Sequence, residues 1–559
     1  MIHKNSPPRR GGREGRARQG EASRDAPSEA KAQTGWSERR DVKLCRTDYP
    51  GASALRLSRL PSSARRGIVL TCGIVSGILL VLSLPKPDLY PLAWIALTPW
   101  LYVMGGVPTL RHTLAAAYAA GLVFFAGTFY WISETMAIYG GLSIPLAIGV
   151  GALFVIVFAL YFVLFALGLH LAIKQFGWGG LLFAAPLWVS VELLRSILLS
   201  GFPWMLSGYA LVPYTGILQM AAWTGIYGLS FVATAVNSLI VYGATSRSKM
   251  ALGIAAAVIL TAKFLPVLAE TRPDDPVPVR LVQTNISLDQ PWTQPDSDQL
   301  LDELGKLSTS GDSRPKFVVW PETPAPFYLN ADAGFRARMQ DIARRLEAYF
   351  LVGYVDAVGE GPSNSAGLLD PKGDQVSRYD KMHLVPFGEY VPFKRLLFFA
   401  ESLTRQVGDF IPGAEYTIAS LDGHRISTAI CYESIFPDLV RRFVKRGSEL
   451  LVVITNDGWF GESSAPYQHL RMGVVRAVEN RRYMVRTANT GISAIIGPYG
   501  RIEASTPIGI RTILDRTVHF RSDRTFYTEY GDVFAYANAI LVAGLLVWRE
   551  HARRNRRTI

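Results

Sequence analysis

The sequence predicts an α-helical membrane bundle of eight transmembrane helices joined to an α/β domain. Long apolar blocks fill the chain before Ala269, and an ordinary mixture of polar and apolar residues follows it. Only 18% of the 559 residues are charged, fewer than a soluble domain usually carries. Basic residues flank the apolar blocks, and after Ala269 short strand-like runs alternate with helical patterns.

The start of the chain is rich in Arg, Gly, Ser and Pro and has few large apolar side chains. Such a segment cannot bury enough apolar surface to fold, so we expect residues 1–66 to be a disordered basic tail. An overlong predicted start is an equally good interpretation. The net charge of +13 gathers largely here and at 549–557. Because both places flank apolar segments, the charge indicates membrane orientation and argues against a nucleic-acid partner.

Eight apolar segments are predicted to cross the membrane, for which a helix needs about 20 residues. They lie at 67–84, 91–107, 113–131, 144–173, 179–199, 221–243, 250–268 and 533–548. The first seven form an expected transmembrane domain, 67–268, and the eighth is a C-terminal transmembrane helix. Basic residues gather in alternate loops, and such loops stay cytoplasmic. Both termini, including the basic tail 549–559, are therefore expected inside.

The block 277–525, between the last two spans, is expected outside the membrane and has an α/β pattern. Strand-like runs lie at 279–286, 316–322, 349–355, 425–432, 449–455 and 491–497. Helical patterns lie at 335–349, 437–446 and 467–485. Strands that alternate with helices predict a layered sheet with helices packed on it.

Four motifs carry candidate chemistry, and each lies at a strand end or in the loop after it. The carboxyl ends of strands are where open α/β sheets usually bind ligands. The motifs are "VVWPET" with Glu322, "RYDKMHLVPFGEYVP" with Lys381 and Glu389, "ICYES" with Cys431, and "TNDGWFG" with Asn456, Asp457 and Trp459.

These residue types favour nucleophilic acyl transfer by the Cys431 thiol. A free thiol has a pKa of about 8.5, so a base must take its proton, and a nearby cation favours the thiolate. Glu322 is the candidate base and Lys381 the candidate cation. The backbone N–H after Cys431, together with Lys381, could hold the oxyanion. Histidine is the commoner base, so a Cys–His pair is an open alternative. The candidates for it are His383, His424 and His469.

Other interpretations stay open from the residues alone. A cysteine after an apolar strand is more often a packing residue. A membrane-anchored amidase would share the candidate residues without needing eight spans. A transporter or receptor is favoured by Glu192 and Arg195 in an apolar segment, because intramembrane charges are often functional. The three cysteines, Cys45, Cys72 and Cys431, predict neither a disulfide framework nor a metal site.

The motifs resemble those of a known family. Glu322 in "WPE", Lys381 in "YDKMHLVPFGEY" and Cys431 in "CYE" resemble the Glu–Lys–Cys triad of the nitrilase, or carbon–nitrogen hydrolase, superfamily. The "HLVPFGEYVP" stretch and the eight spans narrow the resemblance to the apolipoprotein N-acyltransferase family, over about residues 67–548. The resemblance implies an αββα sandwich at 277–525, on the periplasmic side of a bacterial inner membrane.

The resemblance also implies a reaction. An acyl chain would pass from a phospholipid, commonly phosphatidylethanolamine, to the cysteine as a thioester. It would then pass to the α-amino group of the N-terminal S-diacylglyceryl cysteine of an apolipoprotein, the last step of bacterial lipoprotein maturation. Such a two-step route predicts ping-pong kinetics. The family likeness further implies a monomer, and the chemistry needs no cofactor or metal.

The resemblance assigns roles to residues. Cys431 is the nucleophile, Glu322 the base and Lys381 the group that stabilises the tetrahedral intermediates. The supporting residues are Glu389, Glu433 and Tyr432, whose N–H is the expected oxyanion donor. The expected substrate-binding residues are Trp292, Asn456 and Trp459. The apolar, basic segment 392–403 follows the loop of Lys381, and we expect it either to enter the membrane interface as a lid or to form a packed helix.

Overall fold

The computed structural model describes residues 61–106, 109–267, 275–288, 293–324, 329–330, 332–358, 361–390 and 409–555. The expected substrate-binding residue Trp292, the expected lid 392–403 and residues 1–60 of the expected tail lie outside these ranges. Helix α1 begins at Ser62, so residues 62–66, which we expected to belong to the disordered tail, are helical. Pro61 precedes this helix, and residues 62–66 contain neither proline nor glycine.

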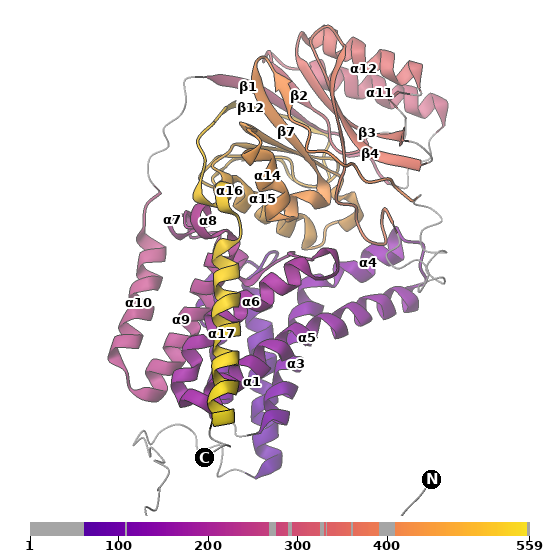
Figure 1. Cartoon of the computed structure of the whole chain (residues 1–559). Helices are drawn as coiled ribbons and strands as arrows, with labels where there is room; N and C mark the ends of the chain where they lie inside the picture. The colour runs from indigo at the N-terminus through magenta and orange to yellow at the C-terminus, as the bar shows by residue number, and fades with distance from the viewer. Residues whose placement is uncertain are drawn as a thin grey trace, which may run out of the picture. The chain divides into compact units, whose positions relative to one another are not determined.

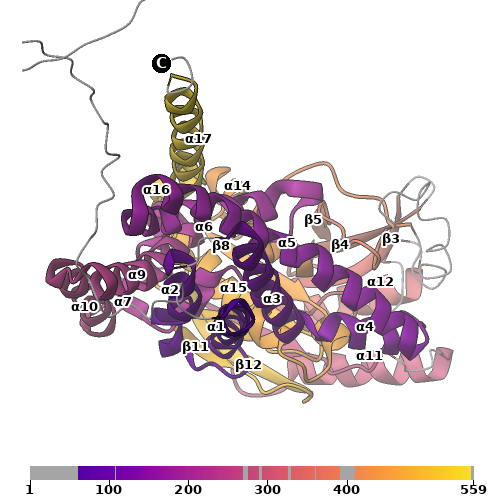
Figure 2. The same ribbon diagram turned by 90° about the horizontal axis from the view of Figure 1, so that it is seen from below.

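The N-terminal part is helical (Figure 1). It comprises α1 (Ser62–Leu82), α2 (Thr98–Gly106), α3 (Leu110–Phe129), α4 (Trp131–Ile138), α5 (Ile144–Phe176), α6 (Ala184–Ile197), α7 (Thr215–Leu218), α8 (Ala221–Thr224), α9 (Ile226–Ser246) and α10 (Lys249–Phe264). Helix α3 packs between α1 and α5, and the three helices lie side by side in Figure 2.

Within the described ranges, four helical stretches are long and apolar enough to cross a bilayer, judged by length and composition. They are Ser63–Leu82, Leu110–Phe129, Ile144–Ser200 and Ile226–Ser246. Val533–Arg549 is apolar but shorter. The expected spans 144–173 and 179–199 lie together in one of these stretches, joined by the 3-10 turn Gly177–Phe183.

In two places the helices of the structure are shorter than the membrane spans that the apolar pattern predicts. The segment 91–107 is divided into a 3-10 turn, Tyr90–Trp94, and helix α2 of 9 residues. Pro91 and Pro99 explain the division, because proline lacks an N–H and is accommodated only in the first turn of a helix. Helix α10 has 16 residues, which at about 1.5 Å each fall short of a hydrocarbon core of about 30 Å.

The α/β part contains two six-stranded sheets. The first has the order β12-β1-β2-β3-β4-β5, with β1 (Pro276–Gln283), β2 (Phe317–Val319), β3 (Tyr349–Val358), β4 (Gly361–Leu369), β5 (Gln375–Asp380) and β12 (Thr512–His519). The second has the order β11-β10-β9-β8-β7-β6, with β6 (Ala419–Leu421), β7 (His424–Ile430), β8 (Leu450–Thr455), β9 (Met484–Ala488), β10 (Ala494–Ile496) and β11 (Ile502–Ser505).

Helices accompany both sheets, and the last one leaves the α/β part beside α6 (Figure 1). They are α11 (Gln294–Thr309), α12 (Ala333–Leu346), α14 (Pro437–Lys445), α15 (Ala465–Asn480), α16 (Phe526–Tyr530) and α17 (Val533–Asn555). Successive residues of β2 face opposite sides, as in any strand. Val318 belongs to the same buried cluster as Met339 of α12, whereas Val319 shares a cluster with Ile430 of the second sheet.

The expected helix 467–485 extends too far. Helix α15 ends at Asn480, where Arg481 takes a left-handed conformation with φ +52°. The residues from Met484 to Ala488 form strand β9, and all of them are buried. Because all five residues are buried, Arg486 and Thr487 included, the strand lacks the alternation of apolar and polar residues that would distinguish it from a helix, which explains the error.

Gln468 of α15 joins the α/β part to the membrane helices. Its side chain is 1% exposed. Its Oε1 accepts a hydrogen bond from Nε1 of Trp204 at 2.8 Å, and its Nε2 donates to the carbonyls of Pro85 at 3.2 Å and Thr128 at 3.1 Å. Three partners from separate membrane-side segments therefore meet on one amide.

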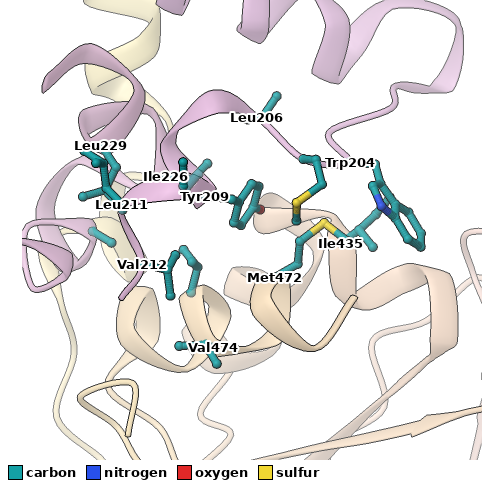
Figure 3. Packing of buried hydrophobic residues seen from close by; sticks show 14 of the residues in the cluster. Trp204, Leu206, Tyr209, Leu211, Val212, Ile226, Leu229, Ile435, Met472 and Val474 are labelled. Carbon is teal, nitrogen blue, oxygen red and sulfur yellow. The ribbon is translucent and has the colours of Figure 1, made fainter. Parts of the chain in front are cut away.

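Further contacts follow along the same helix. Arg471 forms a two-bond ion pair with Asp88, both bonds at 2.7 Å. Oε1 of Glu479 accepts from the first backbone N–H of α9, that of Ile226, at 3.0 Å. Apolar side chains pack alongside, and Figure 3 shows membrane-side residues facing residues of the α/β part. The labelled ones are Trp204, Leu206, Tyr209, Leu211, Val212, Ile226 and Leu229 on one side and Ile435, Met472 and Val474 on the other.

We predict that Gln468→Leu destabilises the protein by about 2–4 kcal/mol, because it leaves the Trp204 N–H and two backbone carbonyls buried without partners. The measurement is the thermal unfolding midpoint in detergent, which should fall by several degrees. Gln299→Leu, on the exposed face of α11, is the matched control and should leave the midpoint unchanged. An unchanged midpoint in Gln468→Leu would contradict the role of this junction.

Candidate active site

The loops after three strands bring Glu322, Lys381 and Cys431 to one place. Glu322 follows β2, Lys381 follows β5, and Cys431 begins the turn after β7. The Lys381 side chain is 1% exposed, and its Nζ lies 3.2 Å from Oε1 of Glu322 and 2.9 Å from Oε1 of Glu389. A buried cation between two carboxylates is thus the centre of the site.

Gly353 lets the backbone of Glu322 reach this position. A Cβ on Gly353 of strand β3 would lie 2.5 Å from the carbonyl oxygen of Pro321 and 2.9 Å from Cα of Glu322. Both distances are shorter than van der Waals contact, so any larger residue would displace the loop. The close approach of the two segments therefore requires glycine here.

Asn364 is a residue of the site that the sequence did not reveal. Its Nδ2 donates to Oε1 of Glu322 and to Oε1 of Glu389, both at 2.8 Å, and its backbone carbonyl accepts from the N–H of Lys381 at 2.8 Å. It lies in β4, whose sequence "GPSNSAGLL" has few of the β-branched residues that mark a strand. A buried amide facing two carboxylates keeps them in place beside the lysine.

Glu433 ties the nucleophile turn to the loop of Lys381 without contacting the lysine itself. The side chain is fully buried. Its Oε2 accepts from the N–H of Ile430 at 2.7 Å, and its Oε1 accepts from Met382 N at 2.7 Å and Tyr379 Oη at 2.7 Å. Burial raises the pKa of Glu433, and these hydrogen bonds oppose the rise.

The electrostatics of the site keep Cys431 protonated at rest. Burial raises the pKa of the Cys431 thiol, the Glu322 carboxylate raises it further, and Lys381 partly opposes both. Burial alone would lower the pKa of Lys381, but Glu322 and Glu389 outweigh it and raise that pKa above its usual value. The lysine is therefore charged, and the thiol needs a base during attack.

Of the two expected substrate-binding residues in this loop, Asn456 contacts the candidate base, whereas Trp459 contacts the membrane part. The backbone N–H of Asn456 donates to Oε2 of Glu322 at 2.8 Å, so this residue touches the candidate base through its main chain. Trp459 is 37% exposed, and its ring lies 5.5 Å from that of Tyr139 near helix α4. Its carbonyl accepts from Thr135 at 2.9 Å. Trp459 thus lies against the membrane part.

Histidine does not serve as a partner of the thiol in the described residues. His383 lies against Phe436, and burial, then Lys381, lowers its pKa to about 4, which makes it a weak base. His424 begins strand β7, at the end opposite the nucleophile, and contacts Glu449. His469 contacts the backbone carbonyl of Cys431, 3.1 Å from Nε2, rather than its sulfur.

The side chain of Tyr432 packs against two neighbouring rings. Its ring centroid is 5.1 Å from that of Phe436 and 5.7 Å from that of His383. Its backbone N–H directly follows the nucleophile, the position from which an oxyanion donor would act. Among the described residues, no group of three or more His, Cys, Asp or Glu is arranged to hold a metal ion.

Two family descriptions match the two parts of the chain. Residues 76–239 match the apolipoprotein N-acyltransferase N-terminal domain, and residues 279–522 match the carbon–nitrogen hydrolase domain. The second match contains every candidate catalytic residue.

Curated relatives match nearly the whole chain. An apolipoprotein N-acyltransferase of Geobacter metallireducens is 38% identical over 517 residues, which cover 89% of this chain and 98% of the relative. One of Rhodopseudomonas palustris is 31% identical and covers 88% and 98% respectively. A solved structure, an amidase from Nesterenkonia sp. AN1, is 20% identical with a TM-score of 0.35, over 48% of this chain and 99% of the amidase.

We predict that Lys381→Met lowers stability by about 3–5 kcal/mol at pH 8, because Glu322 and Glu389 lose their buried counter-charge. Unfolding midpoints of both proteins at pH 8 measure it. Lys445→Met, an exposed lysine of α14, is the control and should show no deficit. An unchanged midpoint in Lys381→Met would contradict the pairing.

Proposed function

This chain belongs to the apolipoprotein N-acyltransferase family, and we propose that its acyl donor is a membrane phospholipid and that Cys431 carries the acyl chain. The observation that carries the proposal is the buried Lys381 ammonium, held between Glu322 and Glu389. Both Glu322 and Lys381 act electrostatically on the Cys431 thiol. The acceptor is the α-amino group of an S-diacylglyceryl cysteine at the N-terminus of an apolipoprotein.

In the first half-reaction the Cys431 sulfur attacks the ester carbonyl of the phospholipid. Glu322 takes the thiol proton as the carbon–sulfur bond forms. The Lys381 ammonium and the N–H of Tyr432 stabilise the resulting oxyanion. The intermediate then collapses, the carbon–oxygen bond breaks, and the lysophospholipid leaves with the proton from Glu322. The product is a thioester on Cys431.

In the second half-reaction the lipoprotein amine attacks the thioester carbonyl. Glu322 takes a proton from the attacking nitrogen, and Lys381 again stabilises the oxyanion. Collapse breaks the carbon–sulfur bond, the amide forms, and the sulfur recovers its proton from Glu322. Glu389 and Asn364 keep Glu322 and Lys381 in position through both steps. Glu389 accepts a hydrogen bond from Lys381, and Asn364 donates to both Glu322 and Glu389. No external oxidant, nucleotide or metal is needed, since the ester donor is more reactive than the amide product.

The membrane part has a physical purpose in this scheme. Pulling an acyl chain out of a bilayer costs about 0.8 kcal/mol per CH₂, so a soluble site could not reach the donor ester cheaply. The short apolar helices α2 and α10 and the apolar part of α17, Val533–Arg549, would complete eight crossings. The α/β part would be an αββα sandwich, which the two sheets and the clusters on either side of β2 support. We propose a monomer of the inner membrane with phosphatidylethanolamine as donor.

The reaction is tested with defined substrates. Purified protein receives a phospholipid of known chains and a diacylated lipopeptide, and initial rates are measured as both are varied. We expect a triacylated lipopeptide by mass spectrometry and parallel double-reciprocal lines, the signature of ping-pong kinetics. Cys431→Ala should abolish the product, whereas Cys72→Ala should retain it. Intersecting lines would contradict a thioester intermediate. Loss of the product in both cysteine variants would contradict a role that is specific to Cys431.

The location is tested by cysteine labelling in a background without Cys45, Cys72 and Cys431. Asp422 lies in an exposed turn of the α/β part, and Arg247 lies in an exposed loop after α9. Each is replaced by cysteine in turn, as Asp422→Cys and Arg247→Cys. A membrane-impermeant maleimide added to spheroplasts should label the first variant and leave the second unlabelled until the membrane is opened. The reverse pattern would contradict a periplasmic site.

A further inference from the structure

Cys431 holds a backbone conformation that residues other than glycine rarely adopt, with φ +51°. Such a conformation costs about 1 kcal/mol or more and persists only when its surroundings impose it. The carbonyl oxygen of Cys431 accepts a hydrogen bond from Oγ of Ser434 at 2.8 Å and lies 3.1 Å from Nε2 of His469. The direction of the thiol therefore depends on what holds this carbonyl.

His469 is itself held by charged neighbours. Its side chain is fully buried in α15, and its Nδ1 lies 3.0 Å from Oδ1 of Asp457 and 3.1 Å from Nη2 of Arg486. Burial raises the pKa of Asp457, but Arg486 and His469 outweigh it and hold that pKa well below its usual range. Burial, and then Arg486, lower the pKa of His469, so the imidazole is neutral near pH 7.

One neutral form of the ring supports the Cys431 carbonyl. With its proton on Nε2, His469 donates to the carbonyl and accepts from Arg486, and the Ser434 hydroxyl is free to donate to the same carbonyl. With its proton on Nδ1, His469 would donate to Asp457 and take the one hydroxyl proton of Ser434, which leaves the carbonyl without either donor. In the Nε2–H form a continuous polar chain runs from the buried ion pair to the nucleophile turn.

The other face of His469 meets a loop of the membrane part. The Trp204 ring lies 5.5 Å from the imidazole between centroids, and its Nε1 donates to Gln468, the neighbour of His469 in the sequence. Figure 3 shows Trp204 in one cluster with Ile435 and Met472, which flank the nucleophile turn and the histidine.

The intramembrane charges Glu192 and Arg195 hold this loop. Nη2 of Arg195 donates to the carbonyls of Trp204 at 3.3 Å and Met205 at 3.2 Å. Oε1 of Glu192 accepts from the backbone N–H of Ser207 at 2.7 Å. Each charge thus contacts the loop backbone, and in the described part of the chain they form no ion pair with each other. This arrangement accounts for two buried charges that the acyl-transfer chemistry does not use.

We propose that His469 is a positioning residue for Cys431, and that Trp204, held by Arg195, supports it from the membrane side. The proposal rests on the proposed role of Cys431 as the acyl-accepting nucleophile. A thiol displaced by about 1 Å loses on the order of 100-fold in rate. The geometry of the nucleophile is in this way connected to the contact between the α/β part and the membrane helices.

Two rates test the proposal: acyl-enzyme formation from a phospholipid of defined chains, and alkylation of Cys431 by iodoacetamide. His469→Phe keeps a ring against Trp204 and breaks the polar chain, so both rates should fall about 10- to 100-fold while the phospholipid KM changes by less than about threefold. His469→Gln, whose amide reaches the carbonyl, should recover part of the loss. His424→Gln removes a carboxylate-bound histidine at the far end of β7 and should keep both rates.

Ser434→Ala and Trp204→Phe keep the test decisive if His469→Phe fails to fold. Ser434→Ala removes only one hydroxyl and should lower both rates. Trp204→Phe loses the bond to Gln468 and part of the ring that packs against His469, and it should lower the rates less. Wild-type rates in folded His469→Phe, or in Ser434→Ala and Trp204→Phe together, would overturn the proposal. Failure of the proposed function gives a different result from failure of this inference. If only the proposed function were wrong, the wild-type protein would form no acyl-enzyme, but the rate of Cys431 alkylation would still fall in the variants.

Discussion

The ammonium group of Lys381 is the charge around which the site is built. An ion removed from water is stable in a protein only when opposite charges and hydrogen bonds replace its hydration. Glu322 and Glu389 supply the charges, and Asn364 bonds to both carboxylates. These residues come from separate strands and loops, so satisfying one buried cation fixes several segments at once. The same charges then act on the Cys431 thiol.

The second constraint is that the site must work on molecules that stay in a bilayer. Helix α15 meets this constraint with a buried amide, an ion pair and apolar side chains that contact membrane-side segments. His469 of the same helix reaches the carbonyl of Cys431. One helix thus contacts both the membrane part and the nucleophile turn, which gives a physical route by which docking and reactivity can depend on each other.

The sequence indicated the candidate catalytic side chains more directly than the elements around them. Glu322 and Lys381 follow strands of one sheet, so their proximity could be inferred. Cys431 follows β7 of the other sheet, and its position beside them depends on how the two sheets pack. Asn364 could not be inferred, because its strand lacks the usual residues and its role appears only when β4 lies between β3 and β5. The contact of His469 with Cys431 joins residues 38 positions apart and depends on packing of α15 that no local pattern encodes.

The proposed mechanism requires a thioester on Cys431, and the intact mass of the protein tests it most directly. Wild-type protein and Cys431→Ala are incubated with a phospholipid of defined chains and no acceptor. A gain of one acyl mass is expected in the wild type alone, removed by neutral hydroxylamine and by the diacylated lipopeptide. An acyl mass that persists in Cys431→Ala, or folded wild-type protein that makes the triacylated product without ever carrying the acyl chain, would contradict it.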